Sequence, residues 1–402
     1  MSRALTRLLA LTCGVTIASV YYAQPLLHTI AGNLRISPSA AAVVVTATQS
    51  GFAVGLVLVV PLGDIIARRP LITALLAIDA VALAASAMAP GLRVLAVLAV
   101  LVGLTSVVVQ MIIPFAATLA PPGRRATTIG TLLGAVLLGI LLSRAFAGIV
   151  AGAISWRAVY AFAAGLMAVL ALVMSQVLPA GGRELGIGFF AQLNAVLRLA
   201  RTRPVLRWRA LIGAAEFAAF SSFWTTVTFL LSGEPFRYSP LKIGLFALVG
   251  VAGAASALTG GRLLDRYRQL RWRASGAGIA VLLGSFGVLA AGARSLGWLI
   301  LGALLMDACC QVIHVTNQAV IYDLVDAARS RVTTIYMTAH FLGGALGTTA
   351  GTIGYSHDGW HGACAVGAGC TGVAVAGWVA VRRHERPTTA LVAATVAAAP
   401  DG

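Results

Sequence analysis

Long apolar stretches separated by short polar loops cover almost the whole chain of 402 residues. A helix that crosses a bilayer needs about 20 mostly apolar residues. By that measure the sequence predicts twelve membrane-spanning helices, near 8–27, 40–62, 70–88, 92–118, 128–150, 156–178, 208–231, 241–260, 274–292, 296–320, 332–354 and 360–381. We therefore expect an all-α integral membrane fold.

Polar residues form one stripe along the tenth predicted span. Asp307, Gln311, His314 and Gln318 follow spacings of four, three and four, and Asn317 lies beside them. Such spacings place residues on one helix face. Ionisable groups inside a membrane usually face a bundle interior or a watery cavity and mark a substrate or proton route. The alternative is hydrogen bonding between helices without a role in transport.

Glycines form a second stripe, on the eleventh predicted span. Gly343, Gly347 and Gly351 repeat every four residues. Small residues at this spacing let membrane helices approach closely, so we expect a packing face with no role in substrate binding.

The composition favours the same class of protein. Apolar residues make up 59% of the chain and charged residues 10%, whereas soluble domains carry about 25% charged residues. The five cysteines lie in apolar segments without metal-type spacing, and no phosphate-binding loop ending in Gly-Lys-Ser/Thr is found. We expect a polytopic membrane protein that uses no metal or cofactor and hydrolyses no ATP.

The net charge of +17 comes from basic residues that gather on alternate loops. With the N-terminus inside, the cytoplasmic segments hold 22 basic residues and the outer loops 6, which leaves Arg144 within a span. Basic residues favour the cytoplasmic side of a membrane, so we expect both termini there. This distribution explains the charge without a nucleic-acid partner, and it predicts a multi-pass protein of the inner membrane.

Two features recur about half a chain apart. Arg125-Ala-Thr-Thr-Ile opens the fifth span, and Arg331-Val-Thr-Thr-Ile opens the eleventh, 206 residues later. Asp64 follows the second span, and Asp265 follows the eighth, 201 residues later. Similar offsets at matching topological places indicate a six-plus-six duplication.

The duplication divides the chain into two bundles and a linker. After the sixth span, apolar residues recur at helical spacing against Arg198 and Arg201, which is typical of an amphipathic helix on the inner leaflet. The last residues are rich in Ala, Thr and Val, so we expect a disordered tail. The predicted units are a bundle over 1–178, a linker over 179–207, a bundle over 208–381 and a cytoplasmic tail over 382–402.

The loops after the second and eighth spans resemble the signature loop of the major facilitator superfamily, Gly-x-Leu-Ala-Asp-Arg-x-Gly-Arg-Arg/Lys. The matching residues are Leu62, Asp64, Arg68 and Arg69 in the first copy and Gly261, Leu263, Asp265 and Arg266 in the second. The sequences YYAQPLL at 21–27 and TNQAV at 316–320 are similar to those of bacterial drug:proton antiporters. The fifth-span motif of that group lacks its Pro here and ends in Ser143-Arg144.

The resemblance implies twelve helices in two six-helix pseudo-repeat bundles, with alternating access to a central cavity. In the signature loop, Asp64 ends a helix at the inner surface, while Arg68 and Arg69 lie at the level of the headgroups. Such a cluster can latch the two halves on the cytoplasmic side. The alternative is a determinant of topology and a helix cap. The predicted gate comprises Asp64, Arg68, Arg69, Gly261, Asp265 and Arg266.

The family implies that helices one, four, seven and ten line the cavity. From these spans we expect the cavity residues to be Tyr21, Gln24, Gln110, Trp224, Gln311 and Asn317. Aromatic walls with few polar groups are typical of a small-molecule pocket, and a nearby carboxylate suits amphiphilic or cationic molecules. For Phe220 and Phe223, ordinary apolar packing is the alternative.

Three carboxylates lie well inside predicted spans, at Asp79, Glu216 and Asp307. A carboxyl group that alternately faces each aqueous side can exchange a proton for substrate. We expect this of Asp307 and Glu216, because the third span of the family lies away from the cavity. His314 would relay the proton or pair with Asp307, unless it is structural. Arg144 needs an anionic partner, either a carboxylate or an anionic substrate.

These patterns favour a monomeric secondary transporter that exports small organic molecules in exchange for protons. A proton-coupled importer of a metabolite is the alternative within the same fold. An intramembrane enzyme would need a nucleophile–base or metal constellation, and a sensing receptor would usually bring a soluble domain. The sequence shows neither pattern.

Overall fold

A computed structural model describes residues 2–121, 124–179, 188–253, 255–256, 271–324 and 329–397, and these residues form helices without any strand. In the first half the helices are α1 (Arg3–Ser19), α2 (Ala23–Leu34), α3 (Pro38–Ala41), α4 (Val43–Leu58), the 3₁₀ helix η1 (Val60–Asp64), α5 (Arg68–Ala87), α6 (Leu92–Ser106), α7 (Val108–Leu119), α8 (Arg125–Ala153) and α9 (Trp156–Val177). In the second half they are α10 (Phe189–Thr202), α11 (Pro204–Ser232), α12 (Pro240–Phe246), the 3₁₀ helix η3 (Ala247–Gly250), α14 (Arg271–Ala291), α15 (Leu296–Leu324) and α16 (Arg329–Ala397).

Ten helical stretches of the described chain are long and apolar enough to cross a membrane. The longest, Arg331–Arg382, contains two predicted spans, because Asp358 and Gly359 depart from helical geometry and Gly359 has a φ of 54°. Glycine adopts this left-handed conformation at little steric cost, so the chain turns there. The eighth predicted span is described over Pro240–Gly253. The predicted all-α membrane fold is confirmed.

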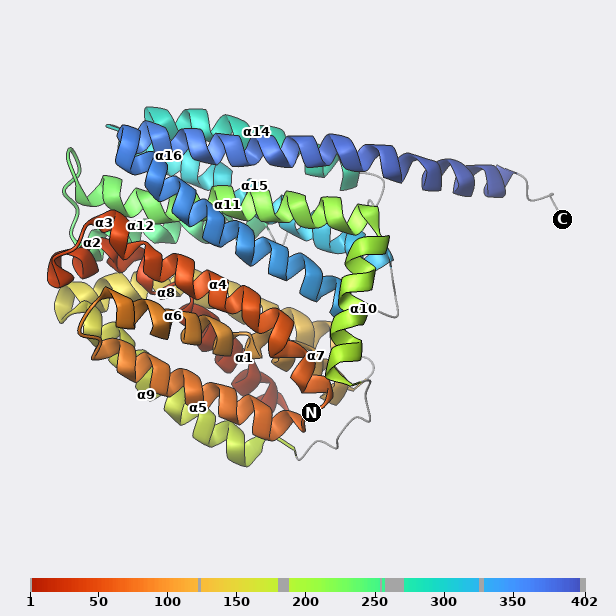
Figure 1. Ribbon diagram of the computed structural model, residues 1–402, viewed down its shortest axis with the longest axis horizontal. Helices are drawn as coiled ribbons and strands as arrows, with labels where there is room; N and C mark the ends of the chain where they lie inside the picture. The colour runs from red at the N-terminus through yellow and green to blue at the C-terminus, as the bar shows by residue number, and fades with distance from the viewer. Residues whose placement is uncertain are drawn as a thin grey trace.

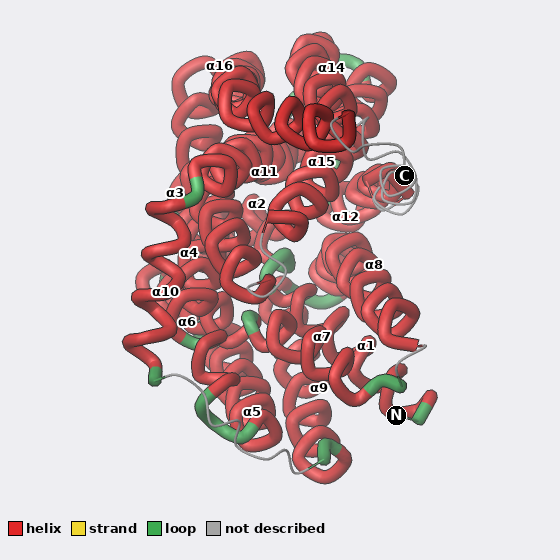
Figure 2. Tube along the Cα trace, turned by 90° about the vertical axis from the view of Figure 1, so that its right-hand side faces the viewer, coloured by secondary structure: helices red, strands yellow, loops and turns green. Residues whose placement is uncertain are grey.

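Two groups of helices lie against each other, one from α1 to α9 and the other from α11 to α16 (Figures 1 and 2). We call them the first and second bundles. They meet where α4 packs on α16, α8 on α12 and α2 on α11. Helix α10 contacts both η1 and α16, so it joins the bundles at one end of the molecule. We call this the α10 end, and the opposite end, where α3 lies, the α3 end (Figure 1).

Hydroxyl and amide groups connect the bundles toward the α3 end. The hydroxyls of Thr46 and Thr349 are hydrogen-bonded at 3.1 Å. Thr348 donates to Gln49 Oε1 at 3.2 Å, and Gln49 Nε2 donates to the hydroxyl of Ser221 at 3.1 Å. All of these side chains except that of Gln49 are small hydroxyl residues, which lets the bundles approach closely there.

Two spans of the first bundle are broken near their middle. A turn at Val20–Tyr22 separates α1 from α2, and Val107 separates α6 from α7. The two breaks lie side by side, because the hydroxyls of Ser19 and Ser106 are 3.0 Å apart. Pro114 lies within α7, seven residues after this second break. Irregular backbone inside a membrane protein is tolerated where it is buried in protein or lines a cavity.

Two described segments outside the spans have helical backbone. Helix α10 lies in the predicted linker, and α16 extends into the predicted tail as far as Ala397. The disorder expected of the tail stays a prediction. Alanine, which is frequent in this segment, has the highest intrinsic helix propensity.

The glycine stripe on α16 packs directly on α11, as predicted. A Cβ atom at Gly343 or Gly347 would lie 2.1 Å from the carbonyl oxygen of Ala214 or Ala218. At Gly351 it would lie 2.2 Å from the hydroxyl oxygen of Ser222. These separations are shorter than van der Waals contact, so α11 and α16 can pack this closely only with glycine.

Gly347→Ala is expected to destabilise the protein by about 1–3 kcal/mol, because the added methyl group overpacks the contact between α11 and α16. The matched control is Gly369→Ala on the same helix, where nothing lies within 4 Å of the added carbon. The control should leave stability unchanged or raise it by up to about 1 kcal/mol. Thermal unfolding of both variants in detergent tests this. Equal melting temperatures would contradict the packing account.

Candidate functional site at the interface between the bundles

Arg144 is the buried cation of the interface, with 3% of its surface exposed on α8. Its Nε atom donates a hydrogen bond to Gln24 Oε1 at 2.9 Å. Its guanidinium carbon lies 4.5 Å from the ring centre of Trp224 and 5.1 Å from that of Tyr21. Phe220 adds a third ring at 5.7 Å. Aromatic faces attract a cation, so three rings from both bundles hold this guanidinium.

Asp307 is the buried anion of the same region, on α15 of the second bundle. Trp224 Nε1 donates to Asp307 Oδ1 at 3.0 Å, so one tryptophan contacts both charged residues. A Cβ atom at Gly250 or Gly253 would lie 3.0 Å from Asp307 Oδ2, so these glycines leave room for the carboxylate. The charges of Arg144 and Asp307 also act on each other.

We call Tyr21, Gln24, Arg144, Trp224 and Asp307 the interface cluster. Tyr21 belongs to the turn between α1 and α2, which places its ring beside Arg144. Beside the cluster is a cavity of about 10 Å³, which is room for about one water molecule. Its walls are formed by Gln24, Pro25, Arg144, Trp224, Val227, Thr228, Ile243, Phe246 and Ala247.

Two donors of the interface cluster are not used. Arg144 Nη2 and Gln24 Nε2 are buried and have no hydrogen-bond partner among the described residues. Buried polar groups in folded proteins are usually hydrogen-bonded. Unused donors beside a cavity can therefore bind an acceptor atom of a ligand.

A second polar group lies within the second bundle and comprises Glu216, His314 and His340, which we call the histidine cluster. One ligand atom from each residue lies within 4.8 Å of the others. His340 Nδ1 lies 3.9 Å from Glu216 Oε2 and donates to the carbonyl oxygen of Gly213 at 3.0 Å. His314 contacts Tyr336 and Gln318, at 3.1 and 3.0 Å, rather than Asp307.

The other residues predicted for the cavity are more widely distributed. Gln311 lies beside Gly253, where an added Cβ would be 3.2 Å from its Cγ atom. Asn317 Oδ1 accepts a bond from Arg209 Nη1 at 3.2 Å, in a separate buried polar group. Gln110 is half-buried on α7. Phe223 packs edge-to-face on both Trp360 and Trp224.

The predicted gate is described in its first copy only. The guanidinium of Arg68 lies 5.5 Å from the ring centre of Phe115, and Arg69 donates to the carbonyl oxygen of Ser175. Asp64 ends η1, and its side chain is not described. The second copy, at Gly261, Asp265 and Arg266, lies outside the described residues. The account of a gate therefore stays a prediction.

The third buried carboxylate, Asp79, has its own partner within the first bundle. Thr105 donates to Asp79 Oδ1 at 2.9 Å, which links α5 to α6. Asp79 is 1% exposed. It provides a control for experiments on Asp307, because both are buried carboxylates but Asp79 does not belong to the interface cluster.

Sequence reasoning missed His340, Tyr336 and Gln49. Each is a polar residue in an apolar span, which is the signal that identified Asp307. Tyr336 and His340 lie four residues apart and share one face of α16, so the spacing that identified Asp307 is a signal that could have found them. Their partners come from other helices.

The chain belongs to the major facilitator superfamily, whose family model matches residues 9–306 and 273–399. It is 40% identical over 368 residues to the uncharacterized transporter YgaY of Escherichia coli O157:H7. The matched region covers 92% of this chain and 93% of that protein. It is 34% identical over 375 residues to a Streptomyces coelicolor protein named "Probable transporter SCO4007", with coverage of 93% and 86%. The protein is thus a multi-pass membrane transporter.

Solved structures show the same fold at low sequence identity. A bacterial homologue of the human lysosomal transporter Spinster, inward-facing and occupied, matches with a TM-score of 0.71 and 14% identity over 94% of this chain and 96% of that chain. The xylose transporter XylE from E. coli, partially occluded and inward open, matches with a TM-score of 0.70 and 14% identity over 93% and 95%. These likenesses confirm the major facilitator fold.

Trp224→Phe is expected to destabilise the protein by about 1–3 kcal/mol, because Asp307 loses a buried hydrogen-bond donor while the ring beside Arg144 remains. Trp298→Phe is the control, because Trp298 is 51% exposed. Thermal unfolding in detergent measures both variants.

A double-mutant cycle separates the hydrogen bond from general packing. In an Asp307→Ala background, Trp224→Phe should reduce the stability of the protein clearly less, because the hydrogen bond is already lost. An equal cost in both backgrounds would show that Trp224 acts through packing alone.

Proposed function

We propose that this protein exports small organic molecules by alternating access, in exchange for protons, and that it is not an enzyme. The observation that carries the proposal is the interface cluster. It places a cation from the first bundle over the ring of Trp224 and a carboxylate from the second bundle at the Nε1 atom of the same residue. Ionisable groups enclosed in a membrane protein typically serve a substrate or proton route.

The exchange of protons would act through the charge of Asp307. When ionised, Asp307 balances the charge of Arg144 across the interface. When protonated, it leaves Arg144 uncompensated, and a buried charge without a partner is strongly unfavourable. The two protonation states thus favour different arrangements of the bundles. Glu216 and His314 are proposed to assist proton transfer within the second bundle.

The substrate would bind in the interface cluster beside Trp224. Ring faces of Tyr21, Phe220 and Trp224 favour a flat apolar body. The unused donors Arg144 Nη2 and Gln24 Nε2 favour an acceptor oxygen or a carboxylate. This proposal differs from the sequence-based preference for cationic molecules, because one of the free donors belongs to the positively charged guanidinium of Arg144. Gln110, Gln311 and Asn317 are proposed to contribute as the cavity opens.

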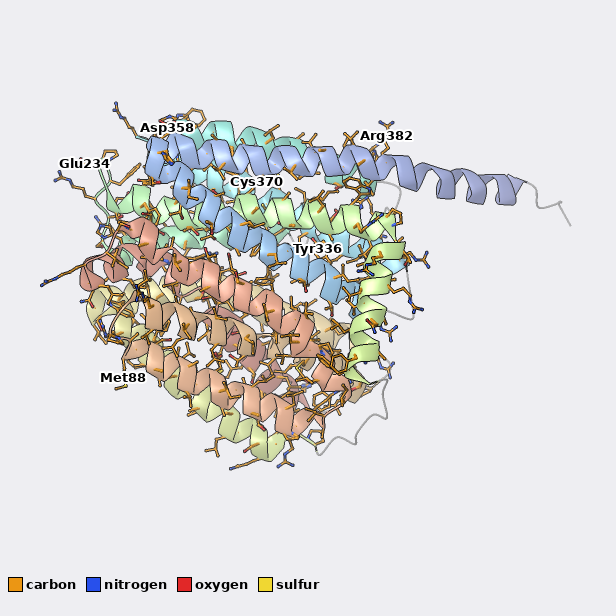
Figure 3. The ribbon with its side chains drawn as sticks, in the orientation of Figure 1. Met88, Glu234, Tyr336, Asp358, Cys370 and Arg382 are labelled. Atoms are coloured by element: carbon orange, nitrogen blue, oxygen red, sulfur yellow. The ribbon has the colours of Figure 1, made fainter. Side chains whose placement is uncertain are left out.

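The α10 end is proposed to face the cytoplasm, with both termini. The N-terminus and Arg382 lie at this end (Figures 1 and 3), and the predicted cytoplasmic loops carry most of the arginines. On this proposal, the hydrogen bond between Thr46 and Thr349 lies on the outer side, where it joins α4 to α16.

The remaining parts of the proposal concern the gate and the units of the chain. The signature loops at Asp64, Arg68 and Arg69, and at Gly261, Asp265 and Arg266, are proposed to latch the cytoplasmic side. The proposed units are 1–178, 179–207, 208–381 and 382–402, in a monomeric protein of the inner membrane.

Proton release from everted membrane vesicles tests the exchange. A panel of anionic, neutral and cationic aromatic compounds is added to vesicles with an acidic lumen. We expect an anionic or acceptor-bearing compound to collapse the pH gradient with the wild type and with Asp79→Asn. With Asp307→Asn the response should fall to background, because the exchangeable proton is lost.

The direction of the pH change distinguishes the alternatives. Antiport acidifies the medium, whereas symport of the added compound moves protons into the lumen. Equal collapse with Asp307→Asn and the wild type would contradict the role of Asp307. Loss of the response with Asp79→Asn would show that removing any buried carboxylate impairs the folded protein, so the effect of Asp307→Asn could not be assigned to proton exchange.

A further inference from the structure

We propose that Glu216, His314 and His340 bind one divalent transition-metal ion of the Zn²⁺ class. The three residues come from α11, α15 and α16, and their ligand atoms lie within 4.8 Å of one another. Ligand atoms that are each about 2.0–2.2 Å from a zinc ion lie within about 4.4 Å of each other. Small side-chain rotations would therefore bring the three groups onto one ion.

The N–H groups of the two imidazoles are oriented as in metal-binding histidines, and the ion would replace Gln318 at His314 Nε2. The carbonyl oxygen of Gly213 can only accept, so His340 Nδ1 carries the hydrogen and Nε2 keeps a lone pair. The amide nitrogen of Gln318 donates to His314 Nε2, so His314 Nδ1 donates to the hydroxyl of Tyr336. Metal-binding histidines almost always donate their other N–H to an oxygen in this way.

The carboxylate of Glu216 provides independent evidence that the histidine cluster binds a cation. The residue is 2% exposed, and its Oε2 atom has no hydrogen-bond partner among the described residues. The nearby His340 Nδ1, at 3.9 Å, is beyond hydrogen-bond distance and already bonds Gly213. Burial of an unpaired carboxylate oxygen is unfavourable, and a bound cation would remove that penalty.

The kind of ion follows from the ligand set. Two imidazoles and one carboxylate suit zinc, nickel, cobalt or copper, whereas magnesium and calcium prefer oxygen ligands. The ligands are 98 and 26 residues apart in the sequence, so no local spacing motif exists. This explains why the sequence predicted no metal.

The metal site would be separate from the interface cluster, and a bound ion would prevent Glu216 and His314 from assisting proton transfer. All three ligands belong to the second bundle, so the ion would fix α11, α15 and α16 relative to one another rather than join the bundles. A row of rings lies between the two sites. Phe217 stacks on His340 at 4.0 Å and on Phe220 at 5.4 Å, and Phe220 lies 6.2 Å from Trp224. Figure 3 shows that Tyr336, the partner of His314, lies toward the α10 end of α16, away from Asp358.

Titration of the full-length protein with ZnCl₂ alone tests the proposal. The protein is purified in detergent without a polyhistidine tag, and the exposed histidines at the bend of α16 are removed by His357→Ala/His361→Ala. Calorimetry should show one zinc ion per chain. His340→Ala and the nearly isosteric Glu216→Gln should each weaken zinc binding at least about tenfold. Asp307→Asn should bind zinc as the background does.

Thermal unfolding gives a second readout. Zinc should raise the melting temperature of the background protein, because it binds the folded state, and magnesium should not. At the same zinc concentration the rise should be smaller in Glu216→Gln, whose folding is checked by size-exclusion chromatography and circular dichroism.

Three results would overturn the proposal. They are no zinc binding by the background protein, unchanged affinity in both ligand variants, or equal stabilisation by magnesium. Because binding is measured without transport, failure here leaves the proton-exchange proposal standing, and failure of the vesicle experiment leaves the metal site standing.

Discussion

The guanidinium of Arg144 imposes the constraint on which the arrangement of the interface depends. A permanent charge enclosed in a membrane protein needs partners that replace water. Here they are the amide of Gln24, three aromatic rings and the charge of Asp307 from the other bundle. Because these partners come from both bundles, the charge is fully supported only while the bundles lie together.

Glycine contacts occur both within and between the bundles. Gly343 and Gly347 bring the backbones of α11 and α16 within contact distance, and Gly148 on α8 approaches the backbone of Gly244 on α12 in the same way. Between the bundles, the described hydrogen bonds join hydroxyls and amides, as at Thr46 with Thr349 and at Gln49 with Thr348. Side chains of this kind find new partners in water, so the interface can part while each bundle stays packed.

Patterns along single spans predicted the features that single helices determine. The apolar spans, the glycine face and the buried carboxylates Asp79, Glu216 and Asp307 were predicted correctly as buried membrane elements. The break at Val107 was not predicted. There, Ser106 and Thr105 hydroxyls bond the carbonyl oxygens one turn back, which weakens the helix in a way that hydropathy does not record.

Partners that come from different helices could not be deduced from one sequence. Asn317 belongs to the predicted stripe, yet it bonds Arg209 on α11 instead of facing the interface cluster. His314 was expected beside Asp307, but its contacts are Tyr336 and Gln318. The rotation of each helix about its axis decides such pairings, and it depends on the packing of all its neighbours.

A disulfide across the α3 end tests most directly whether the bundles part there in each transport cycle. The hydroxyl oxygens of Thr46 and Thr349 are 3.1 Å apart, so Thr46→Cys/Thr349→Cys should cross-link readily under a mild oxidant. The account predicts that the cross-linked protein stops transporting, that a reductant restores transport, and that neither single variant responds. Continued transport by the fully cross-linked protein would contradict alternating access through this end.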